Sequence, residues 1–273
     1  MSPTPIHITV GGARPTDLPI NKVIGGQTPA QYEAFVPHIG ENWAADTTGP
    51  TVEYPATVGI LRGAPTVNQS VAIGAERTIE LIRDATGPVV VAGLSEGGMV
   101  ADEVARRLAG NPDAPPAESL TFVVFGSPGR GLLRKMVPYG VHVPLIGYTQ
   151  RHPPAGQYDT SYVIGEYDGW ADPPDRLWNL VAGLNAVMGA AQVHVASALA
   201  HPDHAVKTAE SVTALGGTVR HYLVPTRHLP LTKPLRDAGV SAGFVDRVER
   251  VLRRVVDAGY RRNDPGHRAG SRI

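Results

Sequence analysis

The sequence predicts an α/β fold in which a mainly parallel sheet is covered by helices on both faces. Apolar runs typical of buried strands occur at 6–10, 88–92 and 120–125. The segments between them repeat apolar residues at helical spacing. Strands that alternate with helices along a chain are typical of parallel sheets, because the crossover helices pack on the two faces.

The first elements follow this pattern in order. The strand at 6–10 ends at Gly11-Gly12-Ala13, where the backbone can approach a ligand closely. Thr28-Pro29-Ala30-Gln31 has the form of a capping box with proline at the first helical position, so a helix is expected after it. A short strand is predicted at 51–54 and a helix at 68–86.

The second half of the chain continues the alternation. Strands are predicted at 160–164 and 219–224, each an apolar and β-branched run. Between them, residues 177–200 form a long apolar stretch with helical spacing, which predicts either a core helix or a lid that lines an acyl-binding site. A last helix at 243–258 is apolar on one face and charged on the other, as covering helices are.

The length of 273 residues is compatible with one α/β domain that carries insertions. We expect a single domain over residues 1–260, with an inserted helical element at about 172–215. Residues 261–273 contain four arginines together with glycine and proline, and we expect them to form a flexible basic tail.

The composition narrows the classes of function. The formal net charge is zero and 18% of residues are charged, so no nucleic-acid partner or anionic membrane surface is expected. The absence of cysteine excludes a thiol nucleophile, thiolate metal sites and disulfides. Residues 1–5 lack the features of a signal peptide and no apolar run approaches 18 residues, so we expect a soluble protein with no membrane span that is not exported by its own N-terminus.

The most informative motif is Gly93-Leu94-Ser95-Glu96-Gly97. It lies between an apolar strand and an amphipathic helix, the context in which G-x-S-x-G forms a nucleophile elbow. A strained turn exposes the serine hydroxyl, and the two glycines remove Cβ atoms that would collide with neighbouring backbone. The helix behind Ser95 directs N–H groups and the positive end of its dipole at an oxyanion. Ser95 is therefore the candidate nucleophile.

A serine nucleophile needs a base, and the base needs an orienting carboxylate. In sheets of this kind the order along the chain is serine, acid and histidine, each on a loop after a strand. Asp168 directly follows the strand that ends at Ile164, so we expect it to be the acid. Glu166 remains an alternative at the same strand end, whereas Asp172 and Asp175 are expected to cap the next helix.

For the base, position along the chain favours His228, which lies just beyond the last strand. His221 lies within that strand, and His194, His201 and His204 fall in the inserted helical region. The pair His201 and His204 is separated by a proline that prevents a shared helix face, and no third ligand is evident, so no metal site is predicted there.

Five segments, considered together, resemble a known family. They are Ala92–Gly98, Phe125–Pro128, Glu166–Pro174, Pro225–Leu231 and Pro234–Arg236. They are similar to the PE-PPE domain of mycobacterial proteins, which are serine hydrolases of the α/β-hydrolase and cutinase-like group, and the resemblance runs from about residue 5 to Tyr260.

The resemblance implies an α/β-hydrolase (cutinase-like) fold and assigns roles to the matching residues. It implies Ser95 as nucleophile, Asp168 as orienting acid and His228 as general base. It also implies an oxyanion hole formed by the backbone N–H of Glu96 and by an amide at Gly12 or Ala13.

The sequence departs from the family in two respects. The family's domain usually follows a PE or PPE module or an export signal, and this sequence has neither, so we expect a free-standing version that is truncated, exported by another route or encoded by a phage of mycolate-containing bacteria. In addition, Glu96 stands where many relatives carry glutamine. Only its backbone is needed for the oxyanion, but a carboxylate beside the nucleophile would disfavour anionic substrates.

We therefore expect a serine carboxylic ester hydrolase that acts through an acyl-enzyme on acyl or glycolipid esters, without a metal or organic cofactor. Association with lipid or the cell envelope is compatible with this function. Two related functions remain open, namely a phage lysin B-like mycolyl ester hydrolase and an acyltransferase. A different class also remains open, a catalytically silent binding or structural module of an envelope or a virion.

Overall fold

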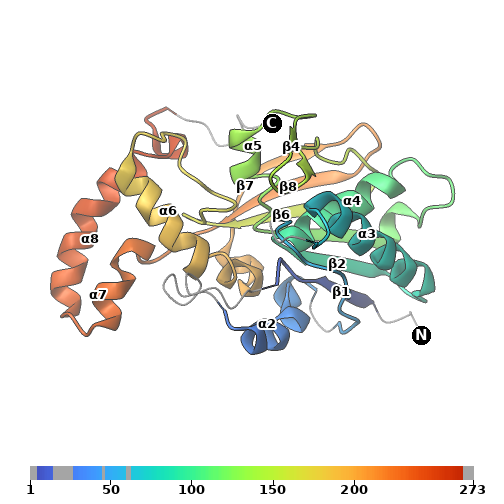
Figure 1. Cartoon of the computed structure of the whole chain (residues 1–273), viewed down its shortest axis with the longest axis horizontal. Coiled ribbons are helices and arrows are strands. Elements are labelled where there is room, and N and C mark those ends of the chain that lie inside the picture. The colour runs from blue at the N-terminus through green and yellow to red at the C-terminus, as the bar shows by residue number, and fades with distance from the viewer. Residues whose placement is uncertain (1–4, 15–26, 45–46, 60–62, 267–273) are drawn as a thin grey trace.

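A six-stranded sheet forms the centre of the molecule (Figure 1). The computed structural model describes residues 5–14, 27–44, 47–59 and 63–266. The strands, in their order across the sheet, are β1 (Ile6–Val10), β2 (Val89–Leu94), β3 (Leu120–Phe125), β6 (Asp159–Gly165), β8 (Thr218–Val224) and β7 (Val206–Val212). The first five pair in parallel, and β7 is antiparallel to β8. The predicted mainly parallel sheet is confirmed.

The segments that follow β1 in the sequence pair with it on opposite sides. Thr48 and Thr51 form parallel bridges to Ile6 and Thr9 of β1, whose other neighbour is β2. The chain thus runs outward from β1 and then returns to add β2 on the opposite side. Ligands of open α/β sheets bind at such a switch point, beyond the carboxyl ends of the strands. The predicted strand at 51–54 is reduced to the single bridge at Thr51.

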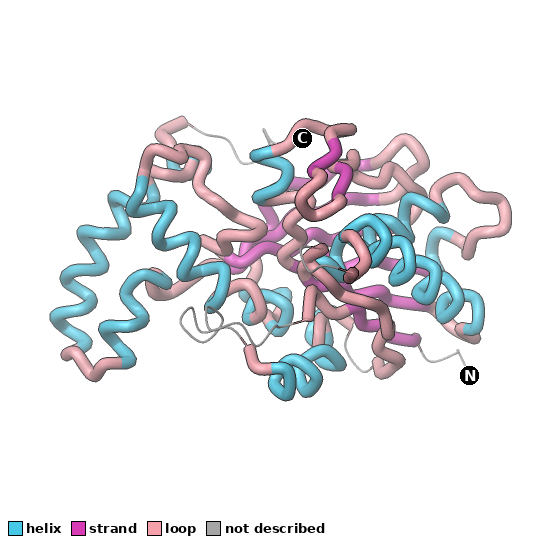
Figure 2. The backbone as a smooth tube through the Cα atoms, viewed as in Figure 1, coloured by secondary structure: helices cyan, strands magenta, loops and turns pink. Residues whose placement is uncertain are grey.

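Helices cover both faces of the sheet, as predicted (Figures 1 and 2). They are α2 (Pro29–Phe35), α3 (Val67–Asp84), α4 (Glu96–Leu108), α5 (Leu132–Met136), α6 (Leu180–Gln192), α7 (Lys233–Asp237) and α8 (Ala242–Asp257). The capping box predicted at Thr28 is present, and Thr66 forms a second one at the start of α3. No helix within the described ranges is long and apolar enough to cross a membrane.

The core has one cluster on each face of the sheet. In β2, Val89 and Val91 pack with α3 and α4, whereas Ala92 and Leu94 pack with α2. Side chains of β3 alternate in the same way between the two clusters. Burial on both faces explains why these strands are continuous apolar runs.

A third cluster joins α6 and α8 to the loop that follows β6 (Figure 1, left). Its fully buried residues are Tyr167, Ala182, Leu229, Val256 and Tyr260. Through this cluster, two helices from the last hundred residues are fixed against the carboxyl end of a central strand.

Two features of the C-terminal half differ from the prediction. The element expected to be helical at 172–215 also contains β7, an edge strand whose exposed polar residues hide its character in the sequence. The tail expected to be flexible from 261 begins with a 3-10 turn at Arg261–Asn263, where Arg262 pairs with Asp172 at 2.7 Å. The rest of the predicted tail, 267–273, lies outside the described residues.

Candidate active site

Ser95 lies on a strained turn between β2 and α4. Its backbone angles are φ 59° and ψ −119°, and a positive φ is rare for a residue with a side chain. A Cβ on Gly93 would collide with the carbonyl of Gly97, and one on Gly97 would collide with that of Val10. The Ser95 amide donates to Phe125 O at 2.9 Å, which ties the turn to the end of β3. This is the geometry of a nucleophile elbow.

The glycines at the end of β1 lie directly beside the serine. A Cβ built on Gly12 would be 2.8 Å from Ser95 Cβ and 3.4 Å from Ser95 Oγ, so only glycine fits at this contact. The phenol of Tyr32 donates to Gly12 O at 2.5 Å, and that of Tyr54 donates to Gly11 O at 2.5 Å. Two tyrosines therefore hold the peptides of this segment, which we call the Gly11–Gly12 loop.

Asp168 forms a buried pair with a histidine. His194 Nδ1 lies 2.7 Å from Asp168 Oδ2, and the side chains are 9% and 0% exposed respectively. A carboxylate can only accept, so the shared proton belongs to Nδ1 and the lone pair of Nε2 is left to accept a proton from elsewhere. This arrangement of acid and imidazole is the one that serine nucleophiles require.

The loop after β6 orients the carboxylate. Tyr167 has a positive φ of 68°, and the amide of Asp168 donates back to Gly165 O at 3.1 Å. Asp168 Oδ1 accepts from the Trp170 amide at 2.9 Å, which leaves Oδ2 for the imidazole. The strained tyrosine is fixed by burial of its ring and by a hydrogen bond of 2.5 Å to Asp257 in α8.

The histidine is positioned by the end of α6. The helix ends at Gln192, and the His194 amide still donates to Gly189 O at 3.3 Å. A Cβ on Gly189 would collide with Tyr167 O, and one on Gly169 would collide with Ala186 O. These two glycines let α6 approach the acid loop closely enough to bring the imidazole to its partner.

The imidazole, the carboxylate and the serine all lie against the end of β3. A Cβ on Gly126 would be 2.9 Å from the His194 ring and 3.3 Å from Asp168 Oδ2. The preceding residue, Phe125, accepts the hydrogen bond from the Ser95 amide. The end of β3 therefore connects the elbow to the acid–imidazole pair.

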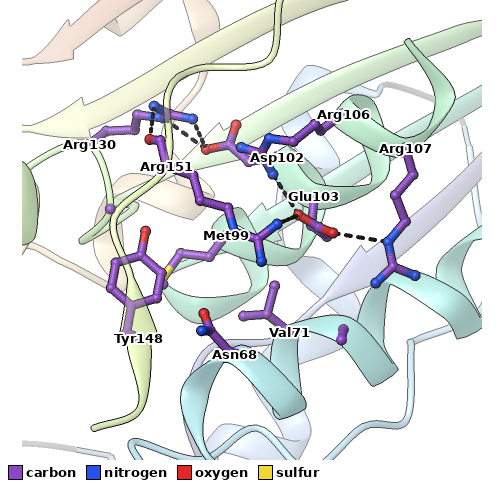
Figure 3. Close-up of a pocket in the computed structure, with 12 residues that line it drawn as sticks. Asn68, Val71, Met99, Asp102, Glu103, Arg106, Arg107, Arg130, Tyr148 and Arg151 are labelled. Atoms are coloured by element: carbon purple, nitrogen blue, oxygen red, sulfur yellow. Dashed lines mark hydrogen bonds and ion pairs between the residues drawn. The ribbon is translucent and has the colours of Figure 1, made fainter. Parts of the chain in front are cut away.

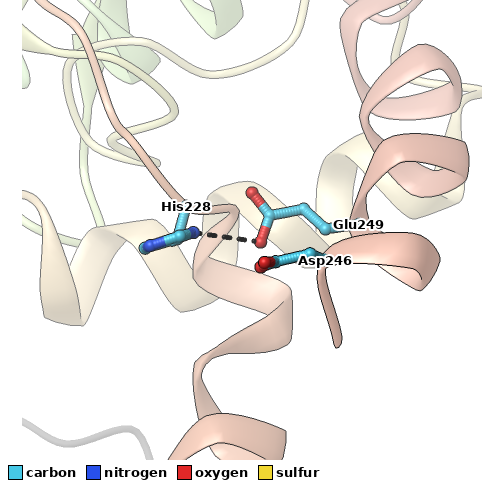
Figure 4. A group of neighbouring side chains, drawn as sticks. All are labelled: His228, Asp246 and Glu249. Atoms are coloured by element: carbon cyan, nitrogen blue, oxygen red, sulfur yellow. Dashed lines mark ion pairs between the residues drawn. The ribbon is translucent and has the colours of Figure 1, made fainter. Parts of the chain in front are cut away.

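The predicted pairing of Asp168 with His228 does not occur. His228 Nδ1 instead lies 3.4 Å from Glu249 Oε2 of α8, and its side chain is 43% exposed (Figure 4). The alternative acid, Glu166, accepts from the Thr226 amide at 2.9 Å. His228 and the Leu229 amide both contact Glu249, so the loop after β8 lies against α8, while the end of α6 occupies the place beside the acid.

One group of side chains has the spacing of a metal site. The nearest ligand atoms of His228, Asp246 and Glu249 lie within 4.8 Å of one another. Arg236 already bridges the two acids, at 2.7 Å from Asp246 and 2.8 Å from Glu249. Burial alone would raise the pKa of Glu249, but hydrogen bonds from Arg236 and Arg253 lower it to about 2. The charge that a metal would neutralise is thus already balanced by arginine.

A small cavity of about 70 Å³ lies between α3, α4 and the segment 129–151 (Figure 3). None of Ser95, Asp168 and His194 lines it. Its four arginines are each paired with an acid of α4, in the pairs Arg130–Asp102, Arg106–Glu103, Arg107–Glu103 and Arg151–Glu103. We interpret this group as an ion-pair network that fastens α4 to the neighbouring segment.

The pairing of His194 with Asp168 was not predicted, because position after the last strand favoured His228. One signal was available. Residues 177–193 contain no charged side chain, so a histidine directly after them is expected to be buried and to need a polar partner. His194 also satisfies the required order along the chain, since it follows both the serine and the acid.

Comparison of the sequence with known proteins identifies its family. The PE-PPE domain matches residues 45–261. Over 97% of the chain the sequence is 45% identical to the PPE family protein PPE63 of Mycobacterium tuberculosis, of which it spans 57%. It is 37% identical to the SL1278 acyltransferase Chp1 over 87% of the chain and 63% of that protein. It is 36% identical to the diacyltrehalose acyltransferase Chp2 over 93% of the chain and 74% of that protein, both from the same organism. The chain therefore belongs to the PE-PPE domain family.

Proposed function

We propose that the protein is a serine enzyme that forms an acyl-enzyme on Ser95 from a lipid ester. The observation that carries this proposal is the buried Asp168–His194 pair beside the end of β3, to which the elbow is also bonded. In this proposal the general base is His194, in place of the predicted His228.

The steps follow from the geometry. His194 Nε2 takes the proton of the Ser95 hydroxyl as the oxygen attacks the ester carbonyl, and Asp168 stabilises the imidazolium that forms. The developing oxyanion is bound by the amide of Glu96, at the start of α4, and by an amide at Gly12 or Ala13. His194 then returns the proton to the leaving alcohol. No step calls for a metal or an organic cofactor.

An apolar surface on α6 supports a lipid substrate. This helix buries Ala182, Asn185, Ala186 and Gly189 on one side. The opposite side and the preceding turn expose large apolar side chains, namely Leu177, Trp178, Leu180, Leu184 and Val187. Exposed apolar surface of this extent marks an interaction site, and it lies on the helix whose end carries His194.

Two acceptors can complete the reaction. Water would release a free acid, and a sugar hydroxyl would give a new ester by the same proton transfers in reverse. The transferase outcome is favoured by the similarity to Chp1 and Chp2, which are both named as acyltransferases. The formation of the acyl-enzyme is common to both outcomes.

The proposal is tested with p-nitrophenyl esters of short and long acyl chains, in the presence and absence of trehalose. We expect release of p-nitrophenol by the wild type and none above background by Ser95→Ala. Mass spectrometry of the products then distinguishes free acid from acylated sugar. Equal rates for the two proteins would overturn the proposal, and so would a catalytically silent wild type with an intact fold.

A further inference from the structure

Glu96 is a buried carboxyl group whose side chain has no role in the proposed steps. It directly follows Ser95 and is 4% exposed. Neither of its carboxyl oxygens has a hydrogen-bond partner among the described residues. An ionised carboxylate in such surroundings is strongly destabilised, so the environment favours the protonated form.

The groups around Glu96 come from three other segments, namely α2, the loop at 51–58 and α3. Ser70 of α3 and the backbone of Thr57 lie near the carboxyl group without a hydrogen bond of normal geometry, and their interaction with its charged form partly opposes the rise in its pKa. Burial, and beyond it the charge of Glu96, raises the pKa of Tyr54. Burial also raises the pKa of Tyr32, opposed by Arg14 and supported by Glu96. The other charged groups that act on Tyr32 are the exposed Glu33 and Glu53.

These are the two tyrosines that hold the Gly11–Gly12 loop. Their hydroxyls donate to the carbonyls of Gly11 and Gly12 at 2.5 Å each. A carboxylate is a stronger acceptor than a peptide carbonyl. The first turn of α4, which carries Glu96, lies against the same peptides, because a Cβ built on Gly97 would be 2.6 Å from Gly11 O. An ionised carboxylate on this turn would therefore draw the phenol protons away from the loop beside Ser95. Its negative charge would also oppose an oxyanion at the same helix end.

We propose that Glu96 is a positioning residue that supports the oxyanion-binding backbone only while its side chain is neutral. Protonated, it leaves Tyr32 and Tyr54 bonded to the loop; ionised, it draws their hydroxyls away. This inference rests on the proposed function. Burial raises the pKa of Glu96 to about 7, so the change falls in the neutral range.

The sign of the effect on activity follows directly. Activity requires protonated Glu96, so it is present below about pH 7 and is lost as the pH rises through the pKa of this group. The profile of kcat therefore declines on its alkaline side.

The test compares kcat profiles from about pH 5 to about pH 9 for the wild type, Glu96→Gln and Glu80→Gln. A short-chain p-nitrophenyl ester is the substrate, read at a wavelength where absorbance of the product does not depend on pH. We expect the wild type to lose up to about tenfold in kcat per pH unit above neutrality. In Glu96→Gln the ratio of kcat at alkaline pH to kcat at about pH 6 should stay close to one, and the exposed control Glu80→Gln of α3 should show the same decline as the wild type.

A second variant tests the same step without changing Glu96. Tyr54→Phe removes one of the two hydroxyls, so kcat should fall at acidic pH and the alkaline decline should flatten. An alkaline limb that persists in Glu96→Gln, or an unchanged profile in Tyr54→Phe, would overturn the inference. If Ser95→Ala is inactive, either of these results contradicts the role of Glu96 alone and not the proposed function. Activity in Ser95→Ala would contradict the proposed function itself.

Discussion

Replacing Glu96 by glutamine should stabilise the protein at alkaline pH and leave its stability nearly unchanged at acidic pH. Burial raises the pKa of this carboxyl from 4.5 to about 7 in the folded state. Below 4.5 the group is protonated in both states and costs nothing. As the pH rises toward 7, the unfolded chain loses the proton while the folded chain keeps it, so the free energy of unfolding falls.

The size of this loss in unfolding free energy follows from the shift in the pKa of Glu96. Each unit of pKa difference corresponds to 1.36 kcal/mol, so a shift of about 2.5 units costs about 3 kcal/mol above pH 7. Glutamine has the shape of the protonated acid and does not titrate. The difference in unfolding free energy between Glu96→Gln and the wild type should therefore grow by roughly 2 to 3 kcal/mol between about pH 5 and about pH 8.5.

Urea denaturation at the two pH values measures this difference directly. Glu80→Gln is the matched control, because Glu80 is an exposed glutamate of α3 and its replacement should leave the difference constant. A constant difference for Glu96→Gln would refute the reasoning, since the carboxyl would then be ionised in the folded protein at no cost. This measurement does not depend on any enzymatic activity.

Three further predictions concern the reaction. Asp168→Asn should lower kcat by about 10³- to 10⁴-fold with little change in KM, because the amide favours the wrong tautomer of the imidazole. Steady-state kinetics measures both constants, and a preserved kcat would contradict the role of Asp168. Gly12→Ala should lower kcat, because the added Cβ would lie 2.8 Å from Ser95 Cβ. A normal kcat in this variant would show that Gly12 does not pack against Ser95 in the active enzyme. Leu180→Glu and Leu184→Glu should reduce turnover of long-chain esters and spare short-chain ones, and equal losses on both would argue against a lipid surface on α6.

Much of the fold was predictable because local patterns and burial agree. The apolar runs of β2 and β3 are buried on both faces, which is the pattern typical of central parallel strands. The capping box at Thr28 likewise marks the start of a helix through local hydrogen bonds alone. The edge strand β7 was not predictable, because it is exposed and, among the described strands, pairs with β8 alone.

The candidate site was likewise predictable only in part. Ser95 and Asp168 follow directly from strands, so their places at the edge of the sheet could be inferred from the chain. The histidine could not, because its position depends on how closely α6 packs against the acid loop. That packing depends on the absence of side chains at Gly169 and Gly189, which no periodic pattern reveals.

The central claim is that His194, held by Asp168, activates Ser95. The rate at which a fluorophosphonate probe labels Ser95 measures this activation directly, and peptide mapping identifies the labelled residue. We predict that His228→Gln is labelled at the wild-type rate and that His194→Gln is labelled at least about a hundredfold more slowly. Fast labelling of His194→Gln together with loss of labelling in His228→Gln would contradict the account.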